Sequence, residues 1–435
     1  MRDIVITLIV FGSIPLILKR PYIGTLLWVW ISVMNPHRLS WGFAYSFPFA
    51  AIIACVTLLA LVITQDPKKL PSSGVINVLM LFSIWISIST IFSFFPDASV
   101  TMWQRVIKIL LMTFVTAMLL KTKEQVQLFI WTLVCSLGFY GVKGGIFTVA
   151  TGGSSRVWGP EGSFIEGNNE VALALIIIIP LMYYLYLQAK KPLVRYGLIA
   201  SMVLCFLASL GSYSRGALLA ALAMAVYLWM RSPKKAAMGV LMILMIPAAI
   251  AFMPKQWTER MDTINTYQQD SSAMGRINAW HMTFNLAMDR PLVGGGFQIY
   301  EKSLFERYAP NPLDIHAAHS IYFQALGEHG FVGLGLYLLM ALLTWRRGSW
   351  IIRNTRGRED LKWAGDLATM IQVSMAGFAV GGAFLSLLYF DVPYYLVAAM
   401  VVVGHIVEQA LKAGPAPAEQ KLPGTARTAL AGNAV

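Results

Sequence analysis

The chain has 435 residues, of which 57% are hydrophobic and 13% are charged, and its formal net charge is +13. Soluble domains average roughly 45–50% apolar and about 25% charged residues, so this composition excludes an ordinary water-soluble protein. The Lys and Arg residues stand mainly in short clusters beside apolar runs. That placement is typical of loops at a membrane surface and argues against nucleic acid as a partner.

Apolar runs recur along most of the chain, and a membrane-spanning helix needs about 20 such residues, with about 17 to 25 tolerated. The runs that approach this length are 3–18, 21–36, 45–64, 74–95, 104–120, 125–148, 169–188, 195–212, 214–230, 236–253, 320–345, 366–388 and 392–411. The first two are short, and the N-terminal run lacks a cleavage motif, so we expect a retained helix there. The sequence predicts an all-α polytopic membrane protein with about 12 to 13 transmembrane helices.

Basic clusters predict which side of the membrane each loop faces. Lys68-Lys69, Lys190-Lys191 and Arg346-Arg347 can all face the cytoplasm of a bacterium together. That orientation places residues 151–168 and the turn 212–215 in the periplasm. The expected regions are N-terminal helices over 1–150, central helices over 151–253, a periplasmic loop over 254–318, C-terminal helices over 319–412 and a disordered cytoplasmic tail over 413–435.

The stretch 254–318 is hydrophilic but mixed in composition, so we expect it to fold. Ser271 and Ser272 can cap a helix, and Pro291 can end it. Within that helix, apolar residues recur at three- and four-residue steps, namely Ile277, Trp280, Phe284 and Met288. The pattern predicts an amphipathic helix that lies near the membrane surface.

Two arginines on the expected periplasmic side are candidates for binding a phosphate. Arg215 lies in a tight turn between two apolar helices, and a guanidinium can bind a phosphate through two donors. Arg276 lies in the first turn of the predicted loop helix, where the helix dipole favours anions. Either could instead be an ordinary interfacial or surface arginine. Arg156 and Arg290 face the same side and are weaker candidates.

The densest polar constellation is the segment His316-Ala317-Ala318-His319-Ser320, which Gln324 and Glu328 follow. An imidazole where a loop enters a helix can take a proton from a sugar hydroxyl near neutral pH. The two histidines could instead bind one metal ion or cap the helix, although no third ligand follows at a suitable spacing. Glu328 falls roughly on the opposite helix face from His319, so a simple dyad between them is not expected.

Three further sequence features bear on the site. The segment from Glu166 to Glu170 offers polar groups, including Asn168 and Asn169, or else caps the helix that follows. The glycines 294–296 lack the Lys-Ser/Thr of a nucleotide-binding loop. The three cysteines lie far apart in apolar runs, without the spacing of a metal site or a disulfide framework. We therefore predict no metal and no cofactor.

Taken in order, these motifs resemble the O-antigen ligase and polymerase family, over about residues 150–340. The features that carry the resemblance are Asn168-Asn169 before a helix, Ser214-Arg215-Gly216, Gly275-Arg276 with Trp280, Pro291 with Gly294 and Gly296, and His319-Ser320 followed by Glu328 and Gly330. More narrowly, the chain is similar to the O-glycosylation ligases that accompany exosortase systems and to lipopolysaccharide O-antigen ligases. Residues 1–150 contribute hydrophobicity only to this resemblance.

The resemblance implies a metal-independent, inverting transfer of a glycan from undecaprenyl pyrophosphate to lipid A-core oligosaccharide. The reaction would take place at the periplasmic face of the bacterial inner membrane, with membrane lipids as further partners. The catalytic candidates are His319, Arg215 and Arg276, and the substrate-binding candidates are Arg156, Asn168, Asn169, Arg290, His316 and Glu328.

Three alternatives stay open. An O-antigen polymerase and a protein O-oligosaccharyltransferase would use the same donor with other acceptors. A transporter or flippase would belong to another class and would need buried charges near the bilayer midplane, for which Lys108 and Lys143 are the obvious candidates.

Overall fold

The computed structural model describes residues 1–65, 68–231, 235–236, 239 and 271–413, and within them helices are joined by turns and loops, which confirms the all-α prediction. The α-helices are α1 (Arg2–Lys19), α2 (Tyr22–Val29), α3 (Phe49–Ile63), α4 (Gly74–Ile91), α5 (Pro96–Leu119), α6 (Lys123–Ala150), α7 (Asn168–Gln188), α8 (Pro192–Gly211), α9 (Arg215–Arg231), α12 (Ser271–Asp289), α13 (Lys302–Tyr308), α14 (Ile321–Asn354), α15 (Lys362–Gly381) and α16 (Asp391–Ala413). The shorter helical turns are η1 (Trp30–Met34), η2 (Pro36–Leu39), η3 (Phe43–Tyr45), η5 (Glu359–Leu361) and η6 (Gly382–Phe384).

Among the described residues, 8 helices are long and apolar enough to cross a membrane, namely α4 to α8, α14, α15 with its flanking turns, and α16. Two shorter apolar stretches, 22–34 and 49–63, fall below that length. The chain is thus a multi-pass membrane protein, while the expected total of about 12 to 13 spans stays a prediction. Most of the expected span 236–253, the loop up to residue 270 and the tail from residue 414 lie outside the described residues.

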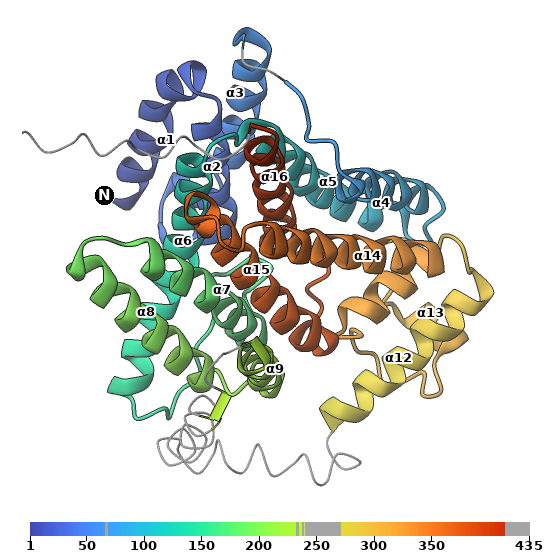
Figure 1. Cartoon of the computed structure of the whole chain (residues 1–435). Coiled ribbons are helices and arrows are strands. Elements are labelled where there is room, and N and C mark those ends of the chain that lie inside the picture. The colour runs from blue at the N-terminus through green and yellow to red at the C-terminus, as the bar shows by residue number, and fades with distance from the viewer. Residues whose placement is uncertain (66–67, 232–234, 237–238, 240–270, 414–435) are drawn as a thin grey trace, which may run out of the picture.

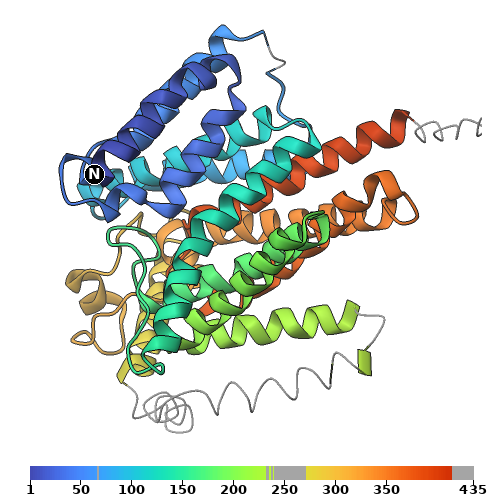
Figure 2. The same ribbon diagram turned by 90° about the vertical axis from the view of Figure 1, so that its left-hand side faces the viewer.

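The helices form one bundle with connecting segments at two ends (Figures 1 and 2). The N-terminus, the 151–167 loop and helices α12 and α13 lie at one end, which we call the site end, whereas α16 finishes at the opposite end (Figure 2). The turns 189–191 and 355–361, which carry basic residues, also lie at that opposite end. This distribution matches the one expected from the basic clusters, and the assignment of the site end to the periplasm stays a prediction.

Helix α7 occupies the middle of the bundle because it is apolar on all sides. In its most apolar window 72% of the residues are buried, against 28% for α8, which lies at the edge. Helix α15 packs against both α7 and α9, and α6 packs against α8. A helix that is hydrophobic all round is expected inside, whereas an edge helix offers apolar side chains to lipid.

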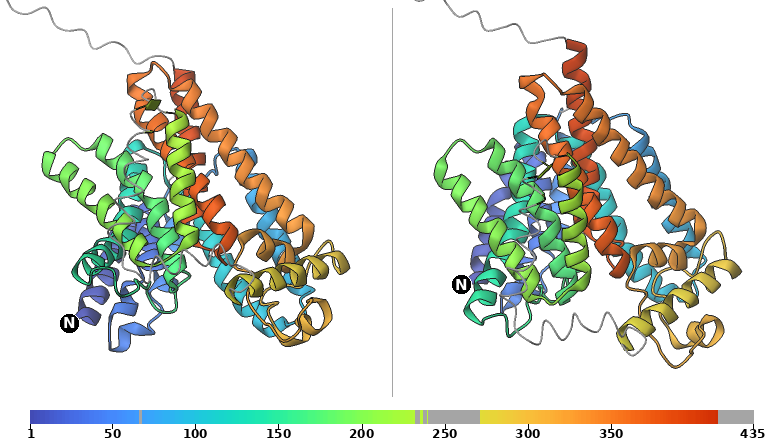
Figure 3. Two further views of the ribbon diagram at one scale, coloured as in Figure 1. Left: turned by 90° about the horizontal axis from the view of Figure 1, so that it is seen from below. Right: turned by 60° about the horizontal axis from the view of Figure 1, so that its bottom comes forward.

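Helix α12 (Ser271–Asp289) ends before Pro291, as predicted, and lies across the site end of the bundle beside α14 (Figure 3). The predicted capping by Ser271 and Ser272 stays a prediction, because residue 270 lies outside the described residues. Ala279, Met282 and Leu286 are buried in a small core that α12 shares with α13. The apolar stripe predicted from the sequence is not this buried face of the helix: Phe284 is 45% and Met288 is 60% exposed. An exposed apolar stripe of this kind suits contact with a membrane surface.

Helix α14 is broken at Gly330, whose φ of 68° and ψ of −172° are not helical. The backbone of the segment that follows α12 binds to the break. The N–H of Gly296 donates to the carbonyl oxygen of Glu328 at 2.9 Å, and the N–H of Phe331 donates to that of Pro291 at 2.8 Å. The predicted motif of Pro291 and its glycines therefore has a structural role: it docks the loop onto a helix whose own hydrogen bonds are interrupted.

Candidate active site

A polar cavity of about 530 Å³ opens at the site end of the bundle. Its walls come from α5, the 151–167 loop, α7, the segments on either side of α13, α14 and the segment 385–390. Polar and aromatic side chains in the lining are Arg105, Trp158, Phe164, Glu166, Glu170, Gln298, Tyr300, Gln324, Glu328 and Tyr389. Small-ligand sites typically measure about 300–1,000 Å³ and combine aromatic surface with a few convergent polar groups. This cavity is therefore the candidate active site.

Helix α12 holds the histidine segment against the start of α14. The indole N–H of Trp280 donates to the carbonyl oxygen of Ala318 at 2.6 Å, and its ring stacks on Phe323 with the centroids 5.0 Å apart. At Gly275 a Cβ would lie 2.6 Å from Nδ1 of His316, so any larger residue would require the His316 ring to move. The predicted glycine and tryptophan of the loop helix thus fix its position on the segment before α14.

His319 lies directly before Ser320, the N-cap of α14, with a left-handed φ of 43°. Its Nδ1 is buried and has no hydrogen-bond partner within the described ranges. The charge of Arg276 acts both on His319 and on Glu170 of α7, so the structure brings these three residues together. Burial, followed by the positive charges of Arg276 and His316, lowers the pKa of His319 to about 4. Its imidazole is therefore neutral at physiological pH.

Arg215 is the first residue of α9 and follows the turn in which Tyr213 has a positive φ of 62°. The side-chain amide of Asn168, at the start of α7, donates to the carbonyl oxygen of Ser212 at 2.7 Å. Asn168 thus anchors the turn that positions Arg215. The guanidinium of Arg215 does not belong to the cavity lining, so its predicted contact with a substrate phosphate stays a prediction.

Two other predicted binding residues have protein partners outside the cavity lining. Arg156 lies 5.7 Å from the ring centroid of Tyr213. Arg290 donates to the carbonyl oxygen of Phe92 at 2.5 Å, which ties the end of α12 to the connection between α4 and α5. Both arginines therefore have a structural role in joining loops.

The remaining pair, Asn169 and His316, flanks the cavity without lining it. Asn169 is half-buried in the first turn of α7, next to the lining residue Glu170. His316 is exposed, its Nδ1 lies 2.8 Å from Oδ1 of Asp314, and the following residue, Ala317, lines the cavity. A substrate-binding role for either side chain stays a prediction.

Glu328 is the predicted binding residue that lines the cavity itself. It is 2% exposed, and the hydroxyl of Tyr389 donates to its Oε2. That hydroxyl also lies 2.5 Å from Nε2 of His329, whose Nδ1 lies 2.6 Å from Oγ of Ser89. Buried polar groups need such partners, because burying an unpaired one costs about 1–3 kcal/mol or more. Glu328 therefore pairs with Tyr389 and not with a histidine before the helix.

Arg105, His329 and Tyr389 were not predicted from the sequence. Arg105 donates to the carbonyl oxygen of Gly162 at 3.1 Å and so holds the 151–167 loop at the cavity. Residues 1–150, which carry none of the motifs of the family resemblance, thus supply part of the wall. Ionisable residues at apolar segments were a usable signal for Arg105 and His329. Tyr389 offered no such signal, because only the fold brings it to Glu328.

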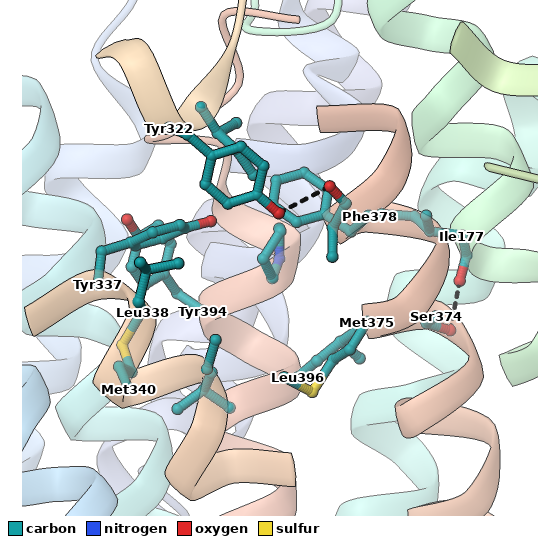
Figure 4. Close-up of a pocket in the computed structure, with 15 residues that line it drawn as sticks. Ile177, Tyr322, Tyr337, Leu338, Met340, Ser374, Met375, Phe378, Tyr394 and Leu396 are labelled. Carbon is teal, nitrogen blue, oxygen red and sulfur yellow. Dashed lines mark hydrogen bonds between the residues drawn. The ribbon is translucent and has the colours of Figure 1, made fainter. Parts of the chain in front are cut away.

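A second cavity, of about 80 Å³, lies between α14, α15 and α16 (Figure 4). The hydroxyl of Tyr322 donates to the carbonyl oxygen of Ala379 at 2.8 Å, and that of Ser374 to Ile177 at 2.6 Å. None of the described residues that line this cavity is charged. It is also smaller than the range of about 300–1,000 Å³ usual for ligand sites, so we assign the chemistry to the polar cavity.

The described part of the chain contains no group of three or more His, Cys, Asp or Glu residues placed to hold a metal ion. The cationic groups at the polar cavity are instead arginines: Arg105 in its lining, and Arg276 acting on Glu170. Guanidinium groups bind phosphate and carboxylate oxygens through two parallel hydrogen bonds.

Fold and cavity together define a multi-pass helical membrane protein with a polar chamber at one end. Residues 200–338 match the family model described as O-Antigen ligase, a range that includes Arg215, Arg276, His319 and Glu328. Residues 1–190 match a family of unknown function. The chain therefore contains a domain of the O-antigen ligase family, as the sequence motifs predicted, and this family implies a glycosyltransferase-like enzyme. A comparison with curated proteins gives no match.

Proposed function

We propose that the protein is an O-antigen ligase that transfers a glycan from undecaprenyl pyrophosphate to lipid A-core oligosaccharide, at the periplasmic face of the inner membrane. One observation supports the proposal: within the family domain Glu328 lines a polar cavity at one end of a membrane bundle, and the charge of Arg276 acts on His319 and on the lining residue Glu170. A site at the membrane surface suits a reaction whose donor and acceptor are both lipid-anchored.

The transfer needs little activation of the donor, because pyrophosphate is a good leaving group. The acceptor oxygen bonds to the anomeric carbon, the bond from that carbon to the phosphate oxygen breaks, and the pyrophosphate leaves with the electron pair. Attack from the face opposite the leaving group inverts the anomeric carbon. Arg276 and Arg215 would stabilise the negative charge that develops on the phosphate, which is the task a metal ion performs in other transferases.

His319 would contact the acceptor hydroxyl. Its buried Nδ1 has no hydrogen-bond partner among the residues described, and its lowered pKa, about 4, keeps the ring neutral. A neutral imidazole can accept a hydrogen bond from a hydroxyl and thereby orient it or take its proton. Arg276 acts on the same histidine, so the donor phosphate and the acceptor hydroxyl would meet between these two side chains.

The alternatives share the donor but differ in the acceptor. A polymerase would use a second carrier-linked glycan, and a protein O-oligosaccharyltransferase would use Ser or Thr hydroxyls. A transporter or flippase fits less well, because both Lys108 and Lys143 are exposed. Neither therefore supplies the buried charge near the midplane that such a protein needs.

The test is reconstitution of the purified protein with an undecaprenyl pyrophosphate glycan and, separately, lipid A-core, carrier-linked glycan or a protein acceptor. We expect product with lipid A-core, and we expect it to persist in EDTA. If product forms only with carrier-linked glycan or only with the protein acceptor, the protein is the corresponding polymerase or protein O-oligosaccharyltransferase and not a ligase. Loss in EDTA that zinc or magnesium restores would instead assign His316 and His319 to a metal.

A further inference from the structure

Behind the polar cavity, a line of four buried side chains joins three parts of the bundle. Ser89 comes from α4, His329 and Glu328 from α14, and Tyr389 from the segment before α16. All four are at most 2% exposed. They are connected in the order Ser89, His329, Tyr389, Glu328, as described above. Only the last two line the cavity, so the line begins at the cavity wall and runs inward.

The hydrogen bonds of this network can be satisfied with Glu328 ionised. The tyrosine hydroxyl then donates to the carboxylate, Nε2–H of His329 donates to the tyrosine oxygen, and Nδ1 accepts from Ser89. The side chain of Gln324 and the backbone of Gln298 also favour the charged form of the carboxylate. Together with Tyr389 they offset part of the cost of burying that charge.

The same bonds can be satisfied, in the opposite direction, with Glu328 protonated. The carboxyl group then donates to Tyr389, the tyrosine hydroxyl donates to Nε2, and Nδ1–H donates to Ser89. The hydroxyl of Ser89 has an acceptor for this case, the carbonyl oxygen of Ile86 at 3.0 Å. The two arrangements differ by one proton and by the imidazole tautomer, and the imidazole is neutral in both. The network can therefore take up a proton without leaving a buried group unpaired.

We propose that Glu328 is the catalytic base of the glycosyl transfer and that Tyr389, His329 and Ser89 are positioning residues that stabilise it in both protonation states. This proposal rests on the proposed function. As the acceptor oxygen bonds to the anomeric carbon, its proton passes to the Glu328 carboxylate, and the pyrophosphate leaves with its electron pair. The protonated Glu328 afterwards releases the proton to water in the cavity. His319 then orients the acceptor hydroxyl and does not deprotonate it.

The experiment compares Glu328→Gln, Tyr389→Phe and the double variant in the reconstituted ligation assay, with kcat and KM measured separately for donor and acceptor. A positioned base contributes about 10²–10⁴ in rate, so Glu328→Gln should lower kcat by about that factor while donor binding persists. Tyr389→Phe should lower kcat by itself. In the Glu328→Gln background it should change kcat less than about twofold, because residues that act as one unit are not additive.

Tyr394→Phe is the matched control, because it also removes one buried tyrosine hydroxyl. The Tyr394 hydroxyl is not part of the network and donates to the carbonyl oxygen of Leu388 at 2.8 Å. The kcat of Tyr394→Phe should stay near that of the wild type. The proposal is overturned if Glu328→Gln keeps kcat within about threefold of the wild type, or if the effects of Glu328→Gln and Tyr389→Phe multiply. If Glu328→Gln fails to fold, Tyr389→Phe provides the test. A kcat clearly below that of Tyr394→Phe supports the proposal, and a kcat equal to it contradicts the proposal. A wild-type protein that transfers no glycan contradicts the proposed function instead.

Discussion

Arg276 and Arg215 were predicted from the sequence as equivalent phosphate ligands, but their surroundings differ. Neither arginine lines the cavity, but the charge of Arg276 acts on His319 and on the lining residue Glu170, whereas Arg215 begins α9. The sequence predicts that both stand on the same side of the membrane. It does not show which of the two acts on a residue of the cavity lining, because that depends on how α12 packs on α14.

We expect Arg276→Ala to lower kcat by about 10²–10³, the cost typical of losing one group that stabilises developing charge. Arg276→Lys should fall between Ala and wild type, since lysine keeps the charge but loses the two-donor fork. Steady-state kinetics with varied donor checks this. The matched control is Arg290→Ala, because Arg290 donates to the carbonyl oxygen of Phe92 away from the cavity. Equal effects on donor kinetics for the two alanine variants would remove the phosphate role from Arg276.

The activity of the enzyme should not follow the ordinary titration of histidine. An unperturbed histidine would gain its proton near pH 6.5, so a neutral His319 would then be lost on mild acidification. Burial and the charge of Arg276 lower the pKa of His319 to about 4, which means that the ring stays neutral until the pH falls towards that value. We therefore expect His319 to cause no decline in kcat/KM between pH 8 and about 5.

The pH profile of kcat/KM for lipid A-core tests this expectation, with donor binding followed at each pH to show that the protein stays folded. His319→Ala should reduce ligation to near background, and the exposed His316→Ala should cost much less. A decline of wild-type kcat/KM centred near pH 6.5, with donor binding unchanged, would contradict the expectation that the His319 ring stays neutral over this range.

At the level of elements, the sequence predicted the helices well and their mutual contacts poorly. The end of α12 before Pro291 follows from proline chemistry, which is local. The face that α12 buries is not local. Ala279 and Leu286 pack in the core shared with α13, while the larger Phe284 is 45% exposed. A helix beside a membrane can place apolar side chains either in the protein core or against the lipid, so the sequence alone does not decide which face is buried.

The break in α14 should make Gly330 irreplaceable. A Cβ there would lie 2.2 Å from the carbonyl oxygen of Leu292, and its φ of 68° with ψ of −172° is accessible essentially to glycine alone. We expect Gly330→Ala to lower the melting temperature in detergent by several degrees and to reduce ligation, because the cavity residue Glu328 stands two positions before the break. Thermal unfolding of the purified variant measures the first effect.

Gly335 in the same helix provides the control, since a Cβ there would meet nothing within 4 Å. Alanine is favoured over glycine in a helix by up to about 1 kcal/mol, so Gly335→Ala should leave the melting temperature unchanged or raise it. If both substitutions behave alike, the break at Gly330 does not require glycine.

For the whole molecule, the prediction that most needs a test is which side the site end faces. Leu313 is 86% exposed in a loop at that end, and Arg356 is exposed in the turn 355–361 at the opposite end. In a variant lacking Cys55, Cys135 and Cys205, an impermeant thiol reagent should label Leu313→Cys in intact cells with a permeable outer membrane. Arg356→Cys should react only after the inner membrane is opened. The reverse pattern would show that the cavity faces the cytoplasm, which would contradict the proposed transfer at the periplasmic face.

The walls of the polar cavity have a consequence for how such proteins can exchange parts during evolution or engineering. Arg105, Trp158 and Glu166 belong to the segment 1–190, Glu328 belongs to 200–338, and the segment carrying Tyr389 comes after both. In a chimera that takes only residues 200–338 from a relative, one part of the cavity wall would therefore come from the relative and the rest from this protein. A chimera should acquire the glycan preference of the relative only when all the segments that line the cavity are exchanged together. Recombination at the family boundary near residue 200 should therefore yield hybrids that insert into the membrane but transfer glycan poorly.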